Sequence, residues 1–156
     1  MRASLTLATI SMFAAASVGA RAQETSRKGL QLRDLPASVQ KTVQDNLKGA
    51  AIRRIGREKE EGVDQYEIET VFNGHARDFN VDIAGRLLVV EETTTLDAIP
   101  VAARTAILKR VGGGKLTTVE TVARSGQPLR YEAAYRDASG KRHEMLVDPD
   151  GRQAKD

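Results

Sequence analysis

Few residues of the chain have the types and spacing that catalysis or metal binding requires. The sequence contains two histidines, His75 and His143, and no cysteine. Zinc sites are built from clustered His and Cys residues, and neither histidine has such a neighbour in the sequence. No metalloprotease helix motif and no serine-hydrolase motif is present. The sequence therefore predicts no catalytic residue, no metal ligand and no cofactor, and we expect that the protein is not an enzyme.

Two short stretches resemble ligand-binding loops but lack the rest of the motif. The Gly-Gly-Gly-Lys stretch at 112–115 follows a predicted helix, and Leu116 stands where a phosphate loop needs Ser or Thr. The Asp-Pro-Asp-Gly stretch at 148–151 lacks the later ligands of a calcium loop. We expect the first stretch to end a helix and the second to form a structural turn.

Charged residues that alternate along predicted strands are the remaining candidates, and they point to protein binding. The candidate partner-binding residues are Glu67, Glu69, Asp78, Arg130, Arg136 and Arg142. Together with Asp82, the first three make one sheet face acidic, whereas the arginines balance acidic residues on the corresponding later face. Such asymmetry can orient a partner and speed its association. A solvated face without a partner is the alternative interpretation.

The first residues predict export. Met1-Arg2 gives a positive start, residues 5–18 are mostly apolar or small, and Ala20 and Ala22 occupy the two positions that signal peptidase reads. We therefore predict a signal peptide at 1–22, a flexible leader at 23–31, and a periplasmic or secreted protein. The apolar run is short for a membrane span, so no membrane insertion is expected after cleavage, and a retained anchor is the alternative.

Composition adds two exclusions. The formal net charge of +3 includes the two arginines of the signal peptide, so the remaining chain is close to neutral. No basic patch with interleaved aromatic residues is present, so nucleic acid is not an expected partner. Because the chain has no cysteine, no disulfide can stabilise it, and its halves must bury surface together to make an adequate core.

Two predicted helices, each with a proline at its start and a glycine at its end, indicate an internal duplication. The first begins after Pro36, carries Val39 and Val43 at helical spacing, and stops at Gly49. The second repeats this pattern 64 positions later, with Pro100, Ala103, Ile107, Val111 and Gly113. We predict two units, at 32–92 and 93–156.

Each predicted helix is followed by predicted antiparallel strands. In residues 65–86 two alternating strands are joined by Asn73-Gly74, the strongest short hairpin signature. Residues 130–152 repeat the Tyr-Glu pair, the turn glycine and the Val-Asp-x-x-Gly-Arg ending. The apolar face is expected to include Tyr66, Ile68, Phe72, Phe79, Val81 and Ile83.

Other strands are less regular. Ile52 and Leu116 break the alternation, so we expect the preceding strands to begin near Arg54 and Thr118. Residues 87–90 supply a fourth strand, whereas its polar counterpart near the end of the sequence is expected to be absent or frayed. The fold class is α+β: two tandem repeats, each with one helix packed on an antiparallel sheet of three to four strands. Residues 91–96 contain no Gly or Pro, which favours one continuous or abutting sheet over two independent units.

These residues resemble a known family. Leu35-Pro36, Tyr66-Glu67, Asn73-Gly74 and Val81-Asp82-x-x-Gly85-Arg86, repeated in order, resemble the PepSY domain, and more closely the PepSY-like group that is similar to the tandem-repeat β-lactamase inhibitor protein. The resemblance implies a secreted or periplasmic, non-enzymatic domain. That inhibitor relies on disulfides, which this chain lacks, so inhibition of β-lactamase itself is not implied.

The functional prediction follows from export, the lack of catalytic motifs and this resemblance. We expect a non-catalytic binding protein, a periplasmic inhibitor or chaperone-like modulator of a protease or other hydrolase. The alternative is an envelope sensor or metal-responsive binding protein that uses the acidic sheet face.

Overall fold

The computed structural model describes residues 29–60 and 62–154. Their fold is α+β, with a seven-stranded antiparallel sheet in the order β1 to β7 and two α-helices. The predicted signal peptide and most of the predicted leader lie outside the described residues. Within the described residues, no helix is long and apolar enough to cross a membrane.

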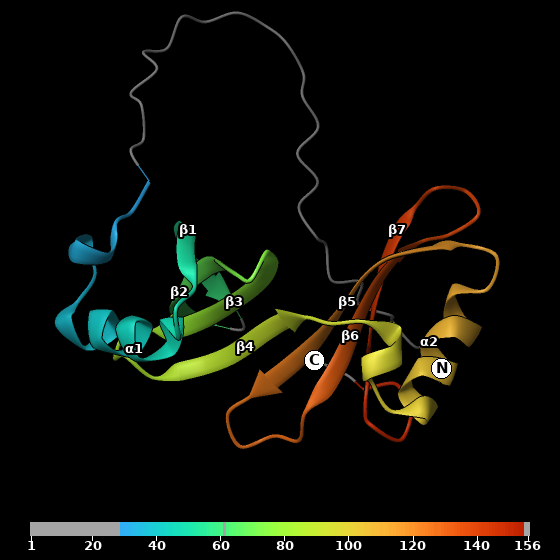
Figure 1. Ribbon diagram of the computed structural model, residues 1–156. Coiled ribbons are helices and arrows are strands. Elements are labelled where there is room, and N and C mark those ends of the chain that lie inside the picture. The colour runs from blue at the N-terminus through green and yellow to red at the C-terminus, as the bar shows by residue number, and fades with distance from the viewer. Residues whose placement is uncertain (1–28, 61, 155–156) are drawn as a thin grey trace, which may run out of the picture.

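The elements follow one another in a similar order in the two halves (Figure 1). The first half contains a 3₁₀ helix at Leu32–Asp34, then α1 (Ala37–Leu47), β1 (Ala51–Glu60), β2 (Val63–Phe72), β3 (His75–Asp82) and β4 (Leu87–Thr93). The second half contains a 3₁₀ helix at Leu96–Ala98, then α2 (Val101–Val111), β5 (Lys115–Arg124), β6 (Arg130–Arg136) and β7 (Arg142–Val147). The seven strands lie in chain order in one sheet, with α2 between β4 and β5 in the chain, so the prediction of one continuous sheet is confirmed.

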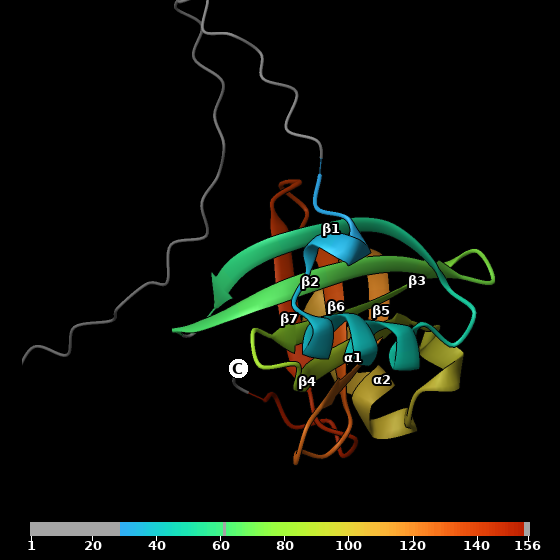
Figure 2. The same ribbon diagram turned by 90° about the vertical axis from the view of Figure 1, so that its left-hand side faces the viewer.

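Both helices bury the apolar stripe predicted from the sequence. Val39 and Val43 of α1 and Ala103 and Ile107 of α2 are fully buried. The proline before each helix fits its start because its missing N–H would have no intrahelical partner. Figure 2 shows α1 beneath the arched strands β1 and β2.

Each helix covers its own core, and both cores lie on one side of the sheet. The first contains Leu35, Val39, Val43, Ile55, Tyr66, Ile68, Phe79 and Val81. The second contains Ile99, Ala103, Ile107, Val119, Tyr131, Ala133, Tyr135, Met145 and Val147. Strand pairing shows that the two cores lie on the same side, because Phe79 pairs with Val90 and Val90 pairs with Ala123. Paired residues share a face, so α1 and α2 lie on the same face.

The irregular spacing before each hairpin is a β-bulge. β1 begins at Ala51 and shifts register between Ile52 and Arg54, and β5 shifts register between Leu116 and Thr118. The prediction that these strands begin near Arg54 and Thr118 was therefore wrong. The extra residue of a bulge returns the following side chains to the core without ending the strand.

The Asn-Gly hairpin has the predicted geometry, but β3, the strand that follows it, ends earlier than predicted. Asn73 and Gly74 both have positive φ values, of 49° and 84°. Ile83 was expected on the apolar face but is 50% exposed, and Asp82 was expected on the wet face but is buried. The Asp82 carboxylate accepts hydrogen bonds from the backbone N–H groups of Ala84 and Arg86, so it closes the turn.

This turn contacts the start of the helix in both halves. A Cβ atom on Gly85 would lie 2.8 Å from Ser38 Cβ and 2.9 Å from the Ser38 carbonyl, and one on Gly151 would lie 2.6 Å from the Ala102 carbonyl oxygen. Thr42 Oγ1 also donates a hydrogen bond to the Gly85 carbonyl at 2.6 Å. Only glycine permits this approach of turn and helix.

We expect Gly85→Ala and Gly151→Ala each to lower the free energy of unfolding by about 3 kcal/mol, because each adds a backbone clash to an unfavourable positive φ. Gly74→Ala and Gly140→Ala are the controls. Both have positive φ but open space around the Cβ position, so each should lose about 1 kcal/mol. Urea unfolding followed by circular dichroism measures the difference. Equal losses in the four variants would contradict the proposed packing role.

Candidate functional site

The face of the sheet opposite the two helices is the candidate site, and we call it the open face. Along each strand, side chains alternate between the helix side and the open face. On β3, Phe79 and Val81 are part of the first core, so Asp78 and Asn80 belong to the open face. Figure 1 shows the helices at opposite ends of the molecule, with the strands of the sheet between them.

Five carboxylates follow one another across the middle strands of the open face. This acidic band consists of Glu67, Glu69, Asp78, Glu91 and Glu120. Asp78 on β3 pairs directly with Glu91 on β4, and Glu91 pairs with Val122 on β5, which places Glu120 diagonally from Glu91. Like charges directly opposite one another destabilise a sheet. The band therefore concentrates negative charge where the two halves meet.

Arg54 on β1 partly neutralises one end of the acidic band. Its guanidinium lies 2.6 Å from a Glu67 carboxylate oxygen and 2.5 Å from a Glu69 carboxylate oxygen. Asp78 accepts a hydrogen bond from the Thr70 backbone N–H at 2.8 Å. These contacts hold the first three carboxylates in place. At Glu91 the attraction of Arg124, and at Glu120 that of Arg142, does not outweigh burial and repulsion, so the centre of the band is incompletely neutralised.

Carboxylates of the band are harder to ionise than usual. Burial raises the pKa of Glu67, Asp78, Glu91 and Glu120 above their ordinary values. At Glu91 the next largest effect is repulsion from Glu120, which raises its pKa further, and at Glu120 it is repulsion from Asp78. At Glu67 the attraction of Arg54 opposes the effect of burial. A positively charged group placed on the band would relieve this repulsion.

A small apolar cluster lies beside the acidic band on the same face. Val89, Val122 and Leu146 are each at most 5% exposed, although no helix among residues 29–60 and 62–154 covers them, and Ala154 packs against them. Val89 pairs with Asn80 and Val122 pairs with Glu91, which fixes their position on the open face. The cluster is therefore buried packing beneath the open face and stabilises the sheet beside the acidic band.

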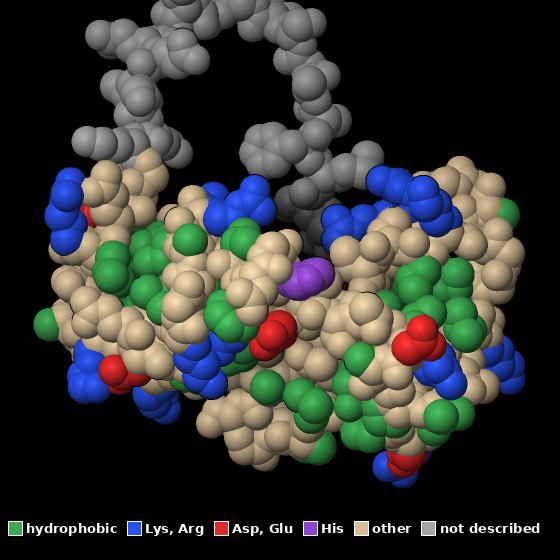
Figure 3. Space-filling view, viewed as in Figure 1, with side chains coloured by type: hydrophobic (Ala, Val, Ile, Leu, Met, Phe, Trp, Pro, Cys, Tyr) green, Lys and Arg blue, Asp and Glu red, His purple; other side chains and the backbone are tan. Residues whose placement is uncertain are grey.

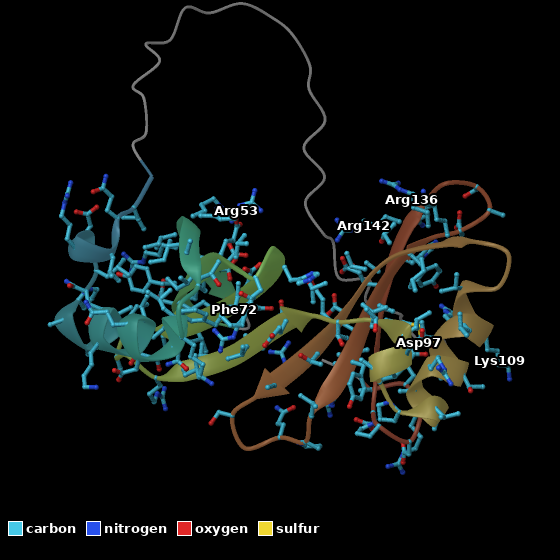
Figure 4. The ribbon with its side chains drawn as sticks, in the orientation of Figure 1. Arg53, Phe72, Asp97, Lys109, Arg136 and Arg142 are labelled. Carbon is cyan, nitrogen blue, oxygen red and sulfur yellow. The ribbon has the colours of Figure 1, made fainter. Side chains whose placement is uncertain are left out.

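The three candidate arginines lie at the second-half side of the open face. Arg130 is held by Asp148, with a nitrogen–oxygen distance of 3.1 Å. Arg136 pairs with Arg142 across β6 and β7, and Arg142 contacts Glu144 at 2.5 Å. Figure 4 shows Arg136 and Arg142 near the same end of these strands, and Figure 3 shows basic side chains gathered along this rim.

The structure therefore places all six candidate residues on one face but divides them into two groups. Glu67, Glu69 and Asp78 belong to the acidic band, whereas the arginines lie on β6 and β7 beside it. Arg130 is opposite Val122, and Arg142 is close enough to Glu120 to oppose the rise in its pKa. Sequence reasoning missed Arg54, Glu91 and Glu120. Alternation alone could have assigned the last two to the open face, but only strand register shows that they continue the acidic band.

The two histidines do not form a common site. His75 begins β3 and is exposed. His143 stacks on Tyr135, with ring centroids 5.2 Å apart, and its Nε2 lies 2.7 Å from an Asp137 carboxylate oxygen. Asp137 also accepts hydrogen bonds from Ser139 and Lys141 in the β6–β7 turn, so this arrangement supports the hairpin. In residues 29–60 and 62–154, no three metal-ligating side chains converge.

No protein-family model and no curated protein matches the chain, but solved structures match its fold. A putative periplasmic protein from Bacteroides eggerthii has a TM-score of 0.65 and 18% identity, with 78% of this chain and 86% of that chain covered. A DUF2874 family protein from Bacteroides ovatus has a TM-score of 0.62 and 14% identity, with coverage of 78% and 85%. A BLIP-like protein from Bacteroides fragilis has a TM-score of 0.58 and 16% identity, with coverage of 78% and 84%. The chain thus has a BLIP-like fold, and at these identities the likeness concerns the fold alone.

We expect Glu91→Gln to stabilise the protein at pH 7. Because the pKa of Glu91 is raised on folding, its ionised form destabilises the folded state, and this effect grows as pH rises above the ordinary value of 4.5. Removing the like-charge pair with Asp78 should add about 0.2–1 kcal/mol to the free energy of unfolding at pH 7. Below pH 4.5 the gain should disappear, since the Glu91 carboxyl then becomes protonated in the folded and the unfolded state alike.

Glu92→Gln is the matched control, since Glu92 is the next residue but faces the helix side. Its carboxylate lies 3.5 Å from Nε of the buried Arg77, so its loss should not stabilise the protein. Urea unfolding of both variants at several pH values measures these effects. A gain for Glu91→Gln that is the same at pH 4 and pH 7 would show that charge repulsion is not its cause.

Proposed function

We propose that the protein is an exported, non-catalytic binding protein, acting as a periplasmic inhibitor or chaperone-like modulator of a protease or other hydrolase. The observation that carries this proposal is the open face, where an incompletely neutralised acidic band crosses the junction between the halves. The solved structures of similar fold include proteins described as periplasmic and as BLIP-like, which supports export and protein binding.

The proposal includes a tandem-repeat, PepSY-like architecture with units at 32–92 and 93–156. The two halves have similar element orders, and β1 and β5 have equivalent bulges. The turn after β3 and the turn after β7 also contact the first turn of the preceding helix through a glycine. A duplicated ancestral unit accounts for these shared features without separate explanations. The predicted signal peptide at 1–22 supplies the export route.

A basic region of the partner is the ligand that best suits the acidic band. Its positive charges would lower the raised pKa values of Glu91 and Glu120 and remove repulsion that the free protein retains. Complementary charge also speeds association, and this effect weakens with salt.

The alternative function is an envelope sensor or a metal-responsive binding protein that uses the acidic face, and its metal-responsive form has less support. It would require carboxylates that converge on one point, and in the described residues no three potential ligands do so. The acidic band instead runs from strand to strand, which suits an extended surface of a partner. We therefore propose binding of a protein and not of a metal ion.

The test is charge reversal at the least neutralised part of the acidic band. Glu91→Lys combined with Glu120→Lys should abolish capture of the periplasmic partner at low salt, because the band would then repel its basic region. Glu67 and Glu69 are less suitable, since their reversal would also break the ion pairs with Arg54. Tagged wild-type and variant proteins would be incubated with native periplasm, and captured proteins would be quantified by mass spectrometry.

The control variant combines Asp45→Lys with Asp97→Lys. It changes the net charge by the same amount, but both residues are exposed and lie on the helix side of the sheet. This variant should capture the same protein as wild type. With the purified partner, surface plasmon resonance should show that the open-face variant lowers the association rate more than it raises the dissociation rate. Equal capture by both variants would exclude the open face as the binding surface.

A further inference from the structure

The two halves differ in how the last strand of their hairpin is covered. In the first half, β4 pairs with the outer edge of β3, with Val90 opposite Phe79 and Glu92 opposite Arg77. Leu87 and Val90 of β4 also pack against the first core. β4 therefore supplies both backbone pairing and apolar cover to the strand before it.

The corresponding edge of β7 is only partly covered. After the turn, Gln153 forms an isolated bridge with Val147, and the Ala154 N–H donates a hydrogen bond to the Leu146 carbonyl at 2.9 Å. β7 is the last strand of the sheet, and among the described residues no strand pairs with the outer edge of Arg142–Met145. Unpaired strand edges readily add a further strand.

A groove lies beside this edge, between α2 and β7. Its volume is about 400 Å³, and its lining residues are Ala106, Lys109, Arg110, Met145, Val147, Gly151 and Gln153. Met145 and Val147 correspond by position in the hairpin to Phe79 and Val81, which β4 covers in the first half. The groove therefore occupies the place that a further strand would fill.

The rim of the groove is basic, unlike its counterpart in the first half. Lys109 and Arg110 stand near the end of α2, where α1 has Asp45 and Asn46. Figure 4 labels Lys109 on α2, and Arg142 stands at the start of the uncovered edge. An acidic residue in an added strand would find complementary charge here.

We propose that the outer edge of β7 binds an extended segment of a partner protein by β-strand addition. The segment would pair with Arg142–Met145, place an apolar side chain beside Met145 and direct a carboxylate towards Lys109 and Arg110. β4 itself has this pattern, since Val90 is followed by Glu91 and Glu92. Arg142 also lies on the rim of the open face, but the backbone edge of β7 and the groove residues Lys109 and Arg110 are not part of the acidic band. This proposal does not depend on the function proposed above.

The probe is a synthetic peptide with the sequence of residues 86–95, RLLVVEETTT, added to the ¹⁵N-labelled full chain. Its binding should shift the amide resonances of residues 142–145 and slow their hydrogen exchange. The control peptide has prolines at the positions of Val89 and Glu91, which prevent pairing as a strand, and it should cause neither change. In the free protein, amides on the outer edge of residues 142–145 should exchange faster than those of β3 that face β4.

Lys109→Glu should weaken binding of the peptide about two- to fivefold, the effect of an exposed ion pair. Lys59→Glu, at the opposite edge of the sheet, should leave binding unchanged, as should the open-face variant with Glu91→Lys and Glu120→Lys. Outer-edge amides that are already as protected as those of β3 would show that the edge is covered and would overturn the proposal. Peptide shifts confined to other strands, or equal affinity of the Lys109→Glu variant, would also overturn it.

Discussion

The approach of one tight turn to one helix in each half determines how this protein is built. Gly85 contacts Ser38 and Gly151 contacts Ala102 at distances that leave no room for a Cβ atom. Each contact fixes a helix against the strands that precede its turn. Because the same contact occurs twice in a continuous antiparallel sheet, both helices lie on one face, and no described helix covers the opposite face.

The uncovered face has to be stable without a helix. Val89, Val122 and Leu146 achieve this with a small cluster that crosses the junction between the halves. Around it, the burial that protects these side chains also raises the pKa of Glu91 and Glu120. The apolar cluster and the raised pKa values in the acidic band therefore have one origin, which is the close packing of β3, β4 and β5 at the junction.

Local features of this fold could be predicted from the sequence, whereas features that depend on register could not. The helix stripes at Val43 and Ile107 follow from spacing, and the Asn73-Gly74 turn follows from the conformations that those residues accept. The predicted burial of Ile83 and exposure of Asp82 were wrong because strand alternation was extended one residue too far. Asp82 instead closes a turn with its own side chain. The acidic band was underestimated because Glu91 pairs with Asp78 across a strand boundary that no local pattern reveals.

The two candidate surfaces use different parts of the same sheet, and this separates their chemistry. The open face presents side chains, so its selectivity depends on charges such as Glu91 and Glu120. The β7 edge presents backbone groups, which favour any extended segment, so selectivity there must come from Lys109, Arg110 and the groove beside Met145. The surfaces also have opposite charge. A single compact partner of one charge therefore suits one surface and not the other, and a partner that engages both needs a basic region and a separate acidic extended segment.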